Sequence, residues 1–131
     1  MTSSFGIRRQ LQTTYDEALI RVPEALKTEG FGVLTEIDVR GTLEKKLGVD
    51  FRRYTILGAC NPPLAHEALQ ADLEVGLMLP CNVVVYEGDD GKAVVLAIDP
   101  TQTMAAAGNP KLAELAEVVK QKLARVIEKL E

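Results

Sequence analysis

The residues with the most chemical potential are two Cys–Asn pairs, Cys60 with Asn61 in ILGACNPPLAHEAL and Cys81 with Asn82 in LPCNVVVYE. They hold the only two cysteines of the chain. Cys60 is predicted to end a strand just before a helix, whose N-terminal amides lower the pKa of a nearby thiol and favour the thiolate. Cys81 is predicted on an apolar strand face, where a thiol usually behaves as a small inert group. Cys60 is therefore the candidate catalytic nucleophile.

Whether the two pairs meet depends on how their strands are paired. If the strands are parallel neighbours joined by a right-handed crossover, the two sulfurs lie near each other. Pro80 cannot donate a backbone hydrogen bond to a sheet, so it favours an edge strand or a bulge beside Cys81. A helix N-cap explains Asn61, whereas no structural role is evident for Asn82.

Two further segments contribute candidates. Asp99, followed by Pro100 at the end of a predicted strand, could act as an acid or base, and an Asx-type turn is the alternative explanation. The segment Thr101 to Gly108 is either a lid over a pocket or an ordinary connection. The candidate ligand-binding residues are Cys60, Asn61, Cys81, Asn82, Asp99 and Met104.

His66, the only histidine, would complete a Cys, Cys, His set of the kind that holds an open zinc position. On a helical wheel it lies away from the apolar stripe of its helix, which favours a solvated surface histidine. The sequence contains no CxxC, glycine-rich phosphate loop or HExxH motif. We therefore expect no metal site, and the sequence names no cofactor.

The composition indicates one globular domain over residues 1–131, with 47% hydrophobic and 26% charged residues. A net charge of −4 argues against nucleic acid, because phosphate-backbone binding needs a basic excess. Neither a signal peptide nor an apolar run of about 18 residues is present, so we expect no membrane partner and a cytoplasmic protein. In that compartment the cysteines are expected to be thiols.

The predicted order of elements is strand, helix, strand, helix, strand, helix, strand, strand, helix. Thr14 and Glu17 have capping-box spacing, and the first helix should run from there to Gly30 with Pro23 inside it. Asn61 and Asn109 should each start a helix, the former extending to Val75. This order predicts an α+β domain with one mixed sheet of about five strands and helices packed on one face. The expected strands cover residues 5–11, 31–39, 52–60, 76–87 and 92–99.

The fourth and fifth strands are apolar on both faces. If helices cover only one face, the other exposes more apolar surface than a soluble monomer usually leaves bare. A symmetric homodimer and a small-molecule pocket are the two ways to cover it. One face carries Leu77, Leu79, Val83 and Val85, and the other carries Met78, Val84, Tyr86, Val94, Leu96 and Ile98.

The segment around RGTLEKKLG has a local positive excess. Its basic residues outnumber Glu44 and Asp50, and either a solvated helix face or a docking patch for an anionic ligand explains them. The basic residues are Arg40, Lys45, Lys46, Arg52 and Arg53.

Most of the chain resembles a known family. The run YTILGACNPPLAHEALQADLEVGLMLPCNVVVYE, the preceding GFGVLTEIDV and the leucine-striped C-terminal helix resemble the small bacterial and archaeal proteins of the domain of unknown function 302 family. The most specific parts are GACNPPLAHEAL and GLMLPCNVVVYE. The resemblance implies an α+β fold similar in outline to the TATA-binding-protein class, usually as a dimer, and it implies no activity. Pro23 departs from the helix-favouring residues expected at its position.

Two functions of different class fit these residues. The preferred hypothesis is a dimeric binding or interaction domain whose second sheet face and Cys–Asn region line a small-molecule pocket. The alternative is a thiol-dependent or metal-dependent enzyme centred on Cys60 and Cys81. Convergence of both sulfurs and the Asn82 amide on an open cavity would distinguish the two hypotheses best.

Overall fold

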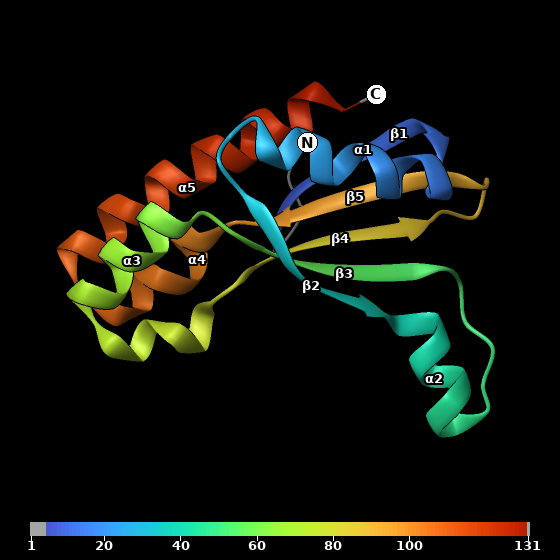
Figure 1. Ribbon diagram of the computed structural model, residues 1–131, viewed down its shortest axis with the longest axis horizontal. Coiled ribbons are helices and arrows are strands. Elements are labelled where there is room, and N and C mark those ends of the chain that lie inside the picture. The colour runs from blue at the N-terminus through green and yellow to red at the C-terminus, as the bar shows by residue number, and fades with distance from the viewer. Residues whose placement is uncertain (1–4, 131) are drawn as a thin grey trace.

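The computed structural model of the chain describes residues 5–130, which form a five-stranded sheet with helices (Figure 1). The strands are β1 (Gly6–Thr14), β2 (Gly32–Asp38), β3 (Tyr54–Cys60), β4 (Cys81–Glu87) and β5 (Lys92–Ile98). The α-helices are α1 (Tyr15–Lys27), α2 (Val39–Leu47), α3 (Pro62–Ala71), α4 (Pro100–Met104) and α5 (Pro110–Lys129). Two 3-10 helices, η1 (Leu73–Met78) and η2 (Ala105–Ala107), complete the order. No helix of the described residues has the length and apolar character to cross a bilayer.

The strands are ordered β1-β5-β4-β3-β2, and every neighbouring pair is antiparallel. The predicted α+β class is confirmed, but the sheet is not mixed, and β3 and β4 are not parallel. The reason lies in their connection. The segment from α3 through η1 packs against α5 beyond the end of the sheet instead of crossing its face, so the chain re-enters the sheet from the end that it left.

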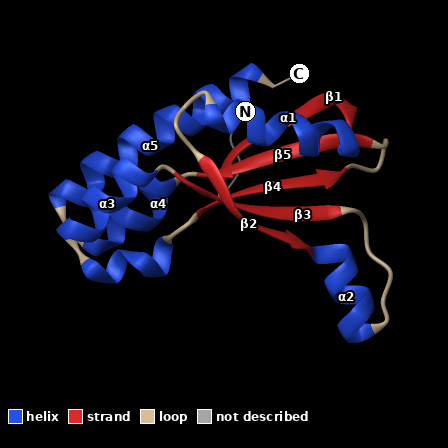
Figure 2. Cartoon of the chain, in the orientation of Figure 1, coloured by secondary structure: helices blue, strands red, loops and turns tan. Residues whose placement is uncertain are grey.

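One face of the sheet is covered by α1 and α5, and within residues 5–130 no helix lies on the other (Figures 1 and 2). Leu57, Val83 and Val95 point into the covered side and are fully buried. Their chain neighbours Ile56, Val84 and Leu96 point the other way and are only half-buried. The alternation follows from the two-residue period of a strand. We call the second side the open face.

The first helix begins as its capping residues predict. The Thr14 hydroxyl accepts a hydrogen bond from the Glu17 amide at 3.2 Å. The helix continues through Pro23 to Lys27, and Gly30 then adopts a φ of 85°, in the left-handed region that favours glycine. The chain turns there into β2.

Two predicted boundaries near Cys81 are wrong. The third helix ends at Ala71 instead of Val75, because Asp72 is extended and its carboxylate accepts from the Glu74 amide to start η1. The fourth strand begins at Cys81 instead of residue 76, and Leu77 in η1 is 90% exposed. The apolar run LEVGLML therefore belongs to a 3-10 helix that buries only one of its sides, and it is not part of a strand.

Pro80 lies on neither an edge strand nor a bulge, contrary to the prediction. It directly precedes β4, the central strand, and is joined to Leu79 by a cis peptide bond. The first pair between β3 and β4 is Ala59 with Cys81, so the ladder does not need the missing amide of Pro80. A side chain at Gly58 would collide with Thr35 and the Pro80 ring, so the proline is packed closely against the adjacent strand.

The C-terminal helix packs on the sheet in the described chain, as its wide apolar stripe predicts. Asn109 caps it by accepting from the amides of Lys111 and Leu112. Val119, Leu123 and Val126 join the main core beneath the sheet, whereas its first turns join a second core with α3, η1 and α4. The helix therefore connects the sheet to the group of helices that carries the candidate site.

Candidate functional site

An apolar cavity of about 290 Å³ lies where the end of β3 and the start of β4 meet α3 and α5. Five separate parts of the chain build its wall, and Asn61 is the only lining residue with a side-chain amide or a charged group. The lining residues are Phe31, Leu34, Ala59, Cys60, Asn61, Leu64, Ala65, Ala68, Leu69, Leu79, Pro80, Cys81, Met104, Leu115 and Val119. The cavity thus suits an apolar molecule.

Antiparallel pairing brings the two cysteines to this cavity. Ala59 is opposite Cys81, and Cys60, the next residue, ends β3 close enough to Cys81 to affect its pKa, so that both line the cavity. Both thiols are free, Cys60 half-buried and Cys81 buried. Met104 adds a third sulfur from α4 and is 3% exposed. Three sulfur-containing side chains therefore share one small apolar space.

Asn61 uses both ends of its amide to hold the wall together. Its oxygen accepts from the Leu64 amide at the start of α3, and its nitrogen donates to the Glu29 carbonyl at 3.1 Å. A Cβ at Gly30 would lie only 3.0 Å from that nitrogen, which keeps the turn before β2 tight against Asn61. Asn61 is thus a structural clamp at the rim of the cavity.

Burial separates the two thiols chemically. Desolvation, with a smaller contribution from the nearby Cys60, raises the pKa of the Cys81 thiol from 9.0 to about 11. Cys81 is therefore a neutral thiol at physiological pH and a poor nucleophile. The lining residues include no histidine, carboxylate or lysine that could act as a base for either sulfur.

Two of the predicted site residues lie elsewhere. Asn82 points to the open face, where it lines a shallow depression with Tyr54, Val84 and Leu96. Asp99 is buried beside the start of α4, where its carboxylate accepts from the amide and the hydroxyl of Thr101. Asp99 thus makes the Asx-type turn that was the alternative explanation.

The environment of Asp99 also explains its charge state. Burial alone would raise its pKa, but the hydrogen bonds from Thr101 and the ammonium of Lys120, 3.3 Å away, outweigh it and lower the pKa. A carboxylate held in this way is ionised and fully engaged.

The remaining candidate, His66, is exposed on α3 and does not line the cavity. Within residues 5–130 no cluster of three histidine, cysteine or carboxylate side chains is placed to hold a metal ion.

Comparison with known proteins identifies the family. The chain matches the family model described as "Domain of unknown function DUF302" over residues 7–130. The chain belongs to the DUF302 family. It is similar to the crystal structure of an uncharacterized conserved protein DUF302 from Bacillus stearothermophilus, with a TM-score of 0.91 and 34% sequence identity over 98% of this chain and 100% of that chain. No curated protein matches the chain. The resemblance noted in the sequence is thus confirmed.

Sequence reasoning missed part of the DUF302 cavity. Phe31 and Leu34 lie in an expected strand and Leu115 and Val119 in the leucine-striped C-terminal helix, and none of the four is among the candidate site residues. A wall residue and a core residue have the same apolar character, so their pattern cannot separate them. The signal that separates them is position along α5, since Leu115 joins the second core and Val119, one turn later, joins the main core, so both lie where the two cores meet.

The basic excess of this DUF302 domain is largely neutralised by ion pairs. Arg53 bonds to Asp16 and Glu87, contacts that raise its pKa further, and Arg52 pairs with Asp89. Arg40 pairs with Asp50 at 3.5 Å. Lys45 and Lys46 of α2 have no ion-pair partner among residues 5–130. The charges near α2 therefore do not form one open anion site.

Proposed function

We propose that this DUF302 chain is a dimeric binding domain whose cavity holds a small apolar molecule. The observation that carries the proposal is the cavity of about 290 Å³, whose wall contains both cysteines and Met104 and is otherwise apolar except for Asn61. Ligand pockets are typically apolar, with few polar groups to orient the ligand. Asn61, the one amide at the rim, is already engaged on both ends, so recognition depends on shape and on contact with sulfur.

The size of the cavity restricts the ligand. A cavity of about 150 Å³ accommodates benzene, so one of about 290 Å³ suits a molecule of one or two rings or a short branched chain. Thioether and thiol sulfurs make favourable contacts with the edges of aromatic rings. We therefore favour a neutral aromatic or unsaturated ligand.

The open face supports the dimeric part of the proposal. Opposite residues on neighbouring strands share a face, and the pairs Ile37 with Ile56, Ile56 with Val84, and Val84 with Leu96 form one apolar row across four strands. Ile37 is 47% exposed at the end of this row. Such a surface is typical of an interface, and a symmetric dimer is the commonest way to cover it.

The two free thiols support a reducing compartment, for which we propose the cytoplasm.

Titration with prodan, a neutral dye whose fluorescence rises in apolar surroundings, tests the binding function. Ala65→Phe places a ring in the cavity and should weaken dye binding about tenfold or more, because the ring occupies the space in which the dye would be buried. Ala113→Phe, at an exposed position of α5 outside the cavity, is the matched control and should leave the affinity unchanged. Dye binding that does not saturate, or equal dye affinities of Ala65→Phe and Ala113→Phe, would contradict the proposal.

A thiol-dependent enzyme is the second candidate, favoured by the presence of two thiols in one cavity. The absence of a base among the lining residues and the raised pKa of Cys81 argue for binding instead. The variant Cys60→Ser with Cys81→Ala separates the two. Under the binding proposal it lowers stability and weakens prodan binding only slightly, because two thiol contacts are lost while Met104 and the shape of the cavity remain. Loss of a substrate-dependent reaction with dye binding intact would establish the enzyme.

A further inference from the structure

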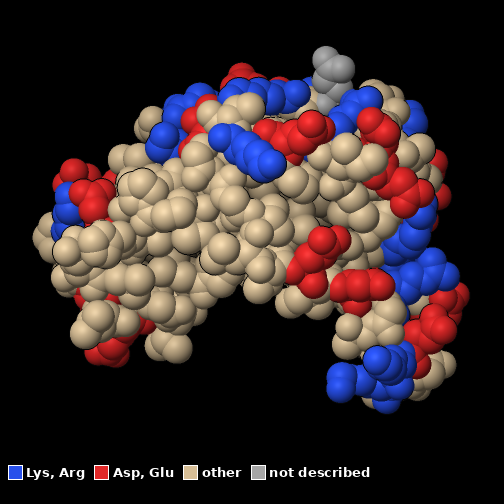
Figure 3. All heavy atoms as spheres, in the orientation of Figure 1, with Lys and Arg blue, Asp and Glu red and all other residues tan. Residues whose placement is uncertain are grey.

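Below the open face the molecule is hollowed between two projecting parts (Figure 3). One is the α2 arm, which we define as α2 with the following loop through Phe51. The other is the η1 lobe, which comprises α3 and η1. Figure 1 shows the two parts at opposite ends of the sheet, with α2 and η1 projecting away from α1 and α5 and with α3 lying beside α5.

The α2 arm has the properties of an interface that lacks its partner. No residue of α2 is buried, and Leu47 and Phe51 are exposed. The ring of Phe51 lies 6.1 Å from that of Tyr54, and Tyr54 stacks on Tyr86 at 5.6 Å, so an aromatic row joins the arm to the open face. Lys45 and Lys46 add positive charge, and Figure 3 shows positive side chains on the arm where it faces the hollow.

The η1 lobe has the opposite charge and the same apolar character. Leu73 and Leu77 are more than four-fifths exposed. Asp72 and Glu74 lie beside them, and Glu74 has no ion pair among the described residues. Each end of the hollow therefore presents apolar side chains together with charges that complement those of the other end.

We propose that in a two-fold dimer the α2 arm of each copy packs alongside the η1 lobe of its partner, so that the two open faces can meet between them. A two-fold axis that is parallel to the open face and perpendicular to the line from arm to lobe exchanges the two ends of the hollow, so each arm meets the partner's lobe and the contact occurs twice. The inference rests on the proposed dimer and specifies its surface. A second copy is the occupant that the charges favour, because the molecule carries both halves of the complementary contact.

The alternative symmetric arrangement would place arm against arm. It would bring Lys45 and Lys46 of one copy against the same two residues of the other, and like charges in an interface are unfavourable. It would also place lobe against lobe and bring Asp72 and Glu74 of one copy against the same two residues of the other. Arm-to-lobe packing avoids both costs.

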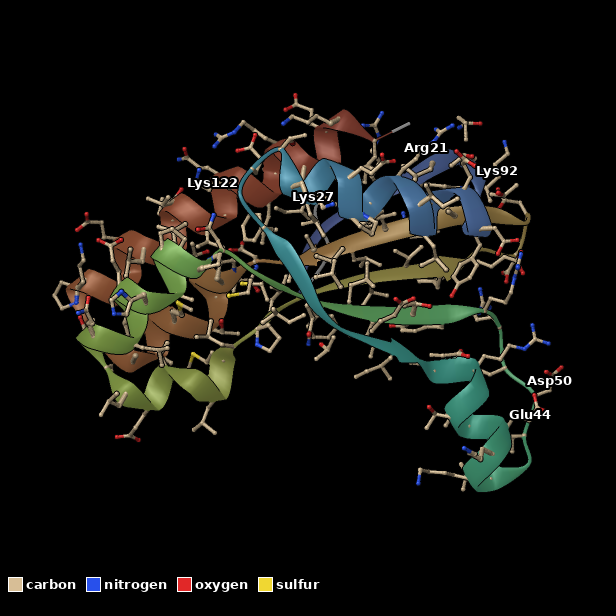
Figure 4. All side chains as sticks on the ribbon, in the orientation of Figure 1. Arg21, Lys27, Glu44, Asp50, Lys92 and Lys122 are labelled. Carbon is tan, nitrogen blue, oxygen red and sulfur yellow. The ribbon has the colours of Figure 1, made fainter. Side chains whose placement is uncertain are left out.

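Charge reversal tests the contact by sedimentation equilibrium of the full chain at low ionic strength. The double change Lys45→Glu with Lys46→Glu, and separately Glu74→Lys, should each raise the dissociation constant of the dimer about tenfold, which corresponds to loss of exposed ion pairs plus new repulsion. Combining the three changes should restore most of the affinity. The matched control is Lys27→Glu with Lys122→Glu, on the helix-covered side of the molecule (Figure 4), and it should leave the constant unchanged.

The outcomes separate this inference from the proposed function. A dimer whose constant is unaffected by both reversals, or is equally weakened by the control, overturns arm-to-lobe packing while the dimer stands. A chain that sediments as a monomer overturns both the packing and the dimer, yet leaves prodan binding in the cavity to be judged by its own variants. Because the Glu74→Lys change lies outside α2, weakening by that variant cannot be ascribed to loss of the α2 helix.

Discussion

The two faces of the central strands carry similar side chains in different surroundings. Leu57 is 1% exposed beneath α1 and α5, whereas the adjacent Ile56 is half-buried on the open face. Val83 and Val84 repeat the contrast on the next strand. Apolar character therefore does not identify the core of this domain. What distinguishes the faces is that helices cover one of them, whereas no helix within residues 5–130 covers the other.

Truncating two neighbouring residues of β3, one on each face, should give the largest difference between the two faces. Leu57→Ala should lower the free energy of unfolding by about 2 to 5 kcal/mol, because it removes buried methyl groups and leaves a cavity. Ile56→Ala should cost the isolated fold much less and should instead weaken the dimer. Urea unfolding at two protein concentrations separates the effects, since only the second depends on concentration. Equal losses at both positions would show that the open face belongs to the core of the monomer.

A change in a covering helix should have a smaller and opposite effect. Pro23 lies inside α1, where it removes one backbone hydrogen bond and crowds the carbonyl four residues earlier. Pro23→Ala should therefore raise the free energy of unfolding by about 1 to 3 kcal/mol. The urea concentration at the midpoint of unfolding should rise, and the slope of the free energy of unfolding against urea concentration should stay unchanged. An unchanged or lower midpoint would mean that the packing of the proline ring outweighs the lost hydrogen bond.

The ion pairs that attach α5 to the turn after α1 make the stability of the fold depend on pH. Hydrogen bonds from Arg125 and then Lys129 lower the pKa of Glu29 from 4.5 to about 2. A carboxylate with a depressed pKa adds stability above its unfolded pKa and loses it as the pH falls through the folded value. Glu29→Gln should thus lower the melting temperature at neutral pH and flatten its decline between about pH 4.5 and 2. If the melting temperatures of the native chain and of Glu29→Gln fall in parallel across that pH range, this role of Glu29 is contradicted.

The smallest expected effect on the fold comes from labelling the thiols. Cys60 is half-buried at the cavity wall, whereas Cys81 faces the covered side with a pKa of about 11. A maleimide reagent at neutral pH should therefore modify Cys60 first, as peptide mass spectrometry would show. Faster modification of Cys81 would mean that the start of β4 opens readily. Protection of both thiols would indicate that they are core residues.

Much of the fold could be predicted because local chemistry sets it. Thr14, Asn61 and Asn109 each begin the helix that its capping side chain predicts. The break at Asp72 was missed because the apolar spacing continues to Val75, and a single capping carboxylate outweighs it. Pro80 was misplaced because a strand boundary one residue away removes the conflict between proline and the ladder.

The candidate site could be predicted only in part. Cys60, Asn61, Cys81 and Met104 line one cavity, whereas Asn82 faces the opposite side because successive residues of a strand alternate. Asp99 is separate because its turn engages it with Thr101 and Lys120. The antiparallel register that joins the cysteines depends on where α3 and η1 pack, which is a tertiary property that a local pattern does not contain.

Sedimentation velocity at micromolar concentration tests most directly the claim that a second copy covers the open face. The native chain should sediment at twice its mass of 14.3 kDa. Val84→Asp, in the middle of the open face, should sediment at 14.3 kDa with its secondary structure intact, because a buried unpaired charge disfavours association. A native chain that sediments as a single 14.3 kDa species would contradict the account.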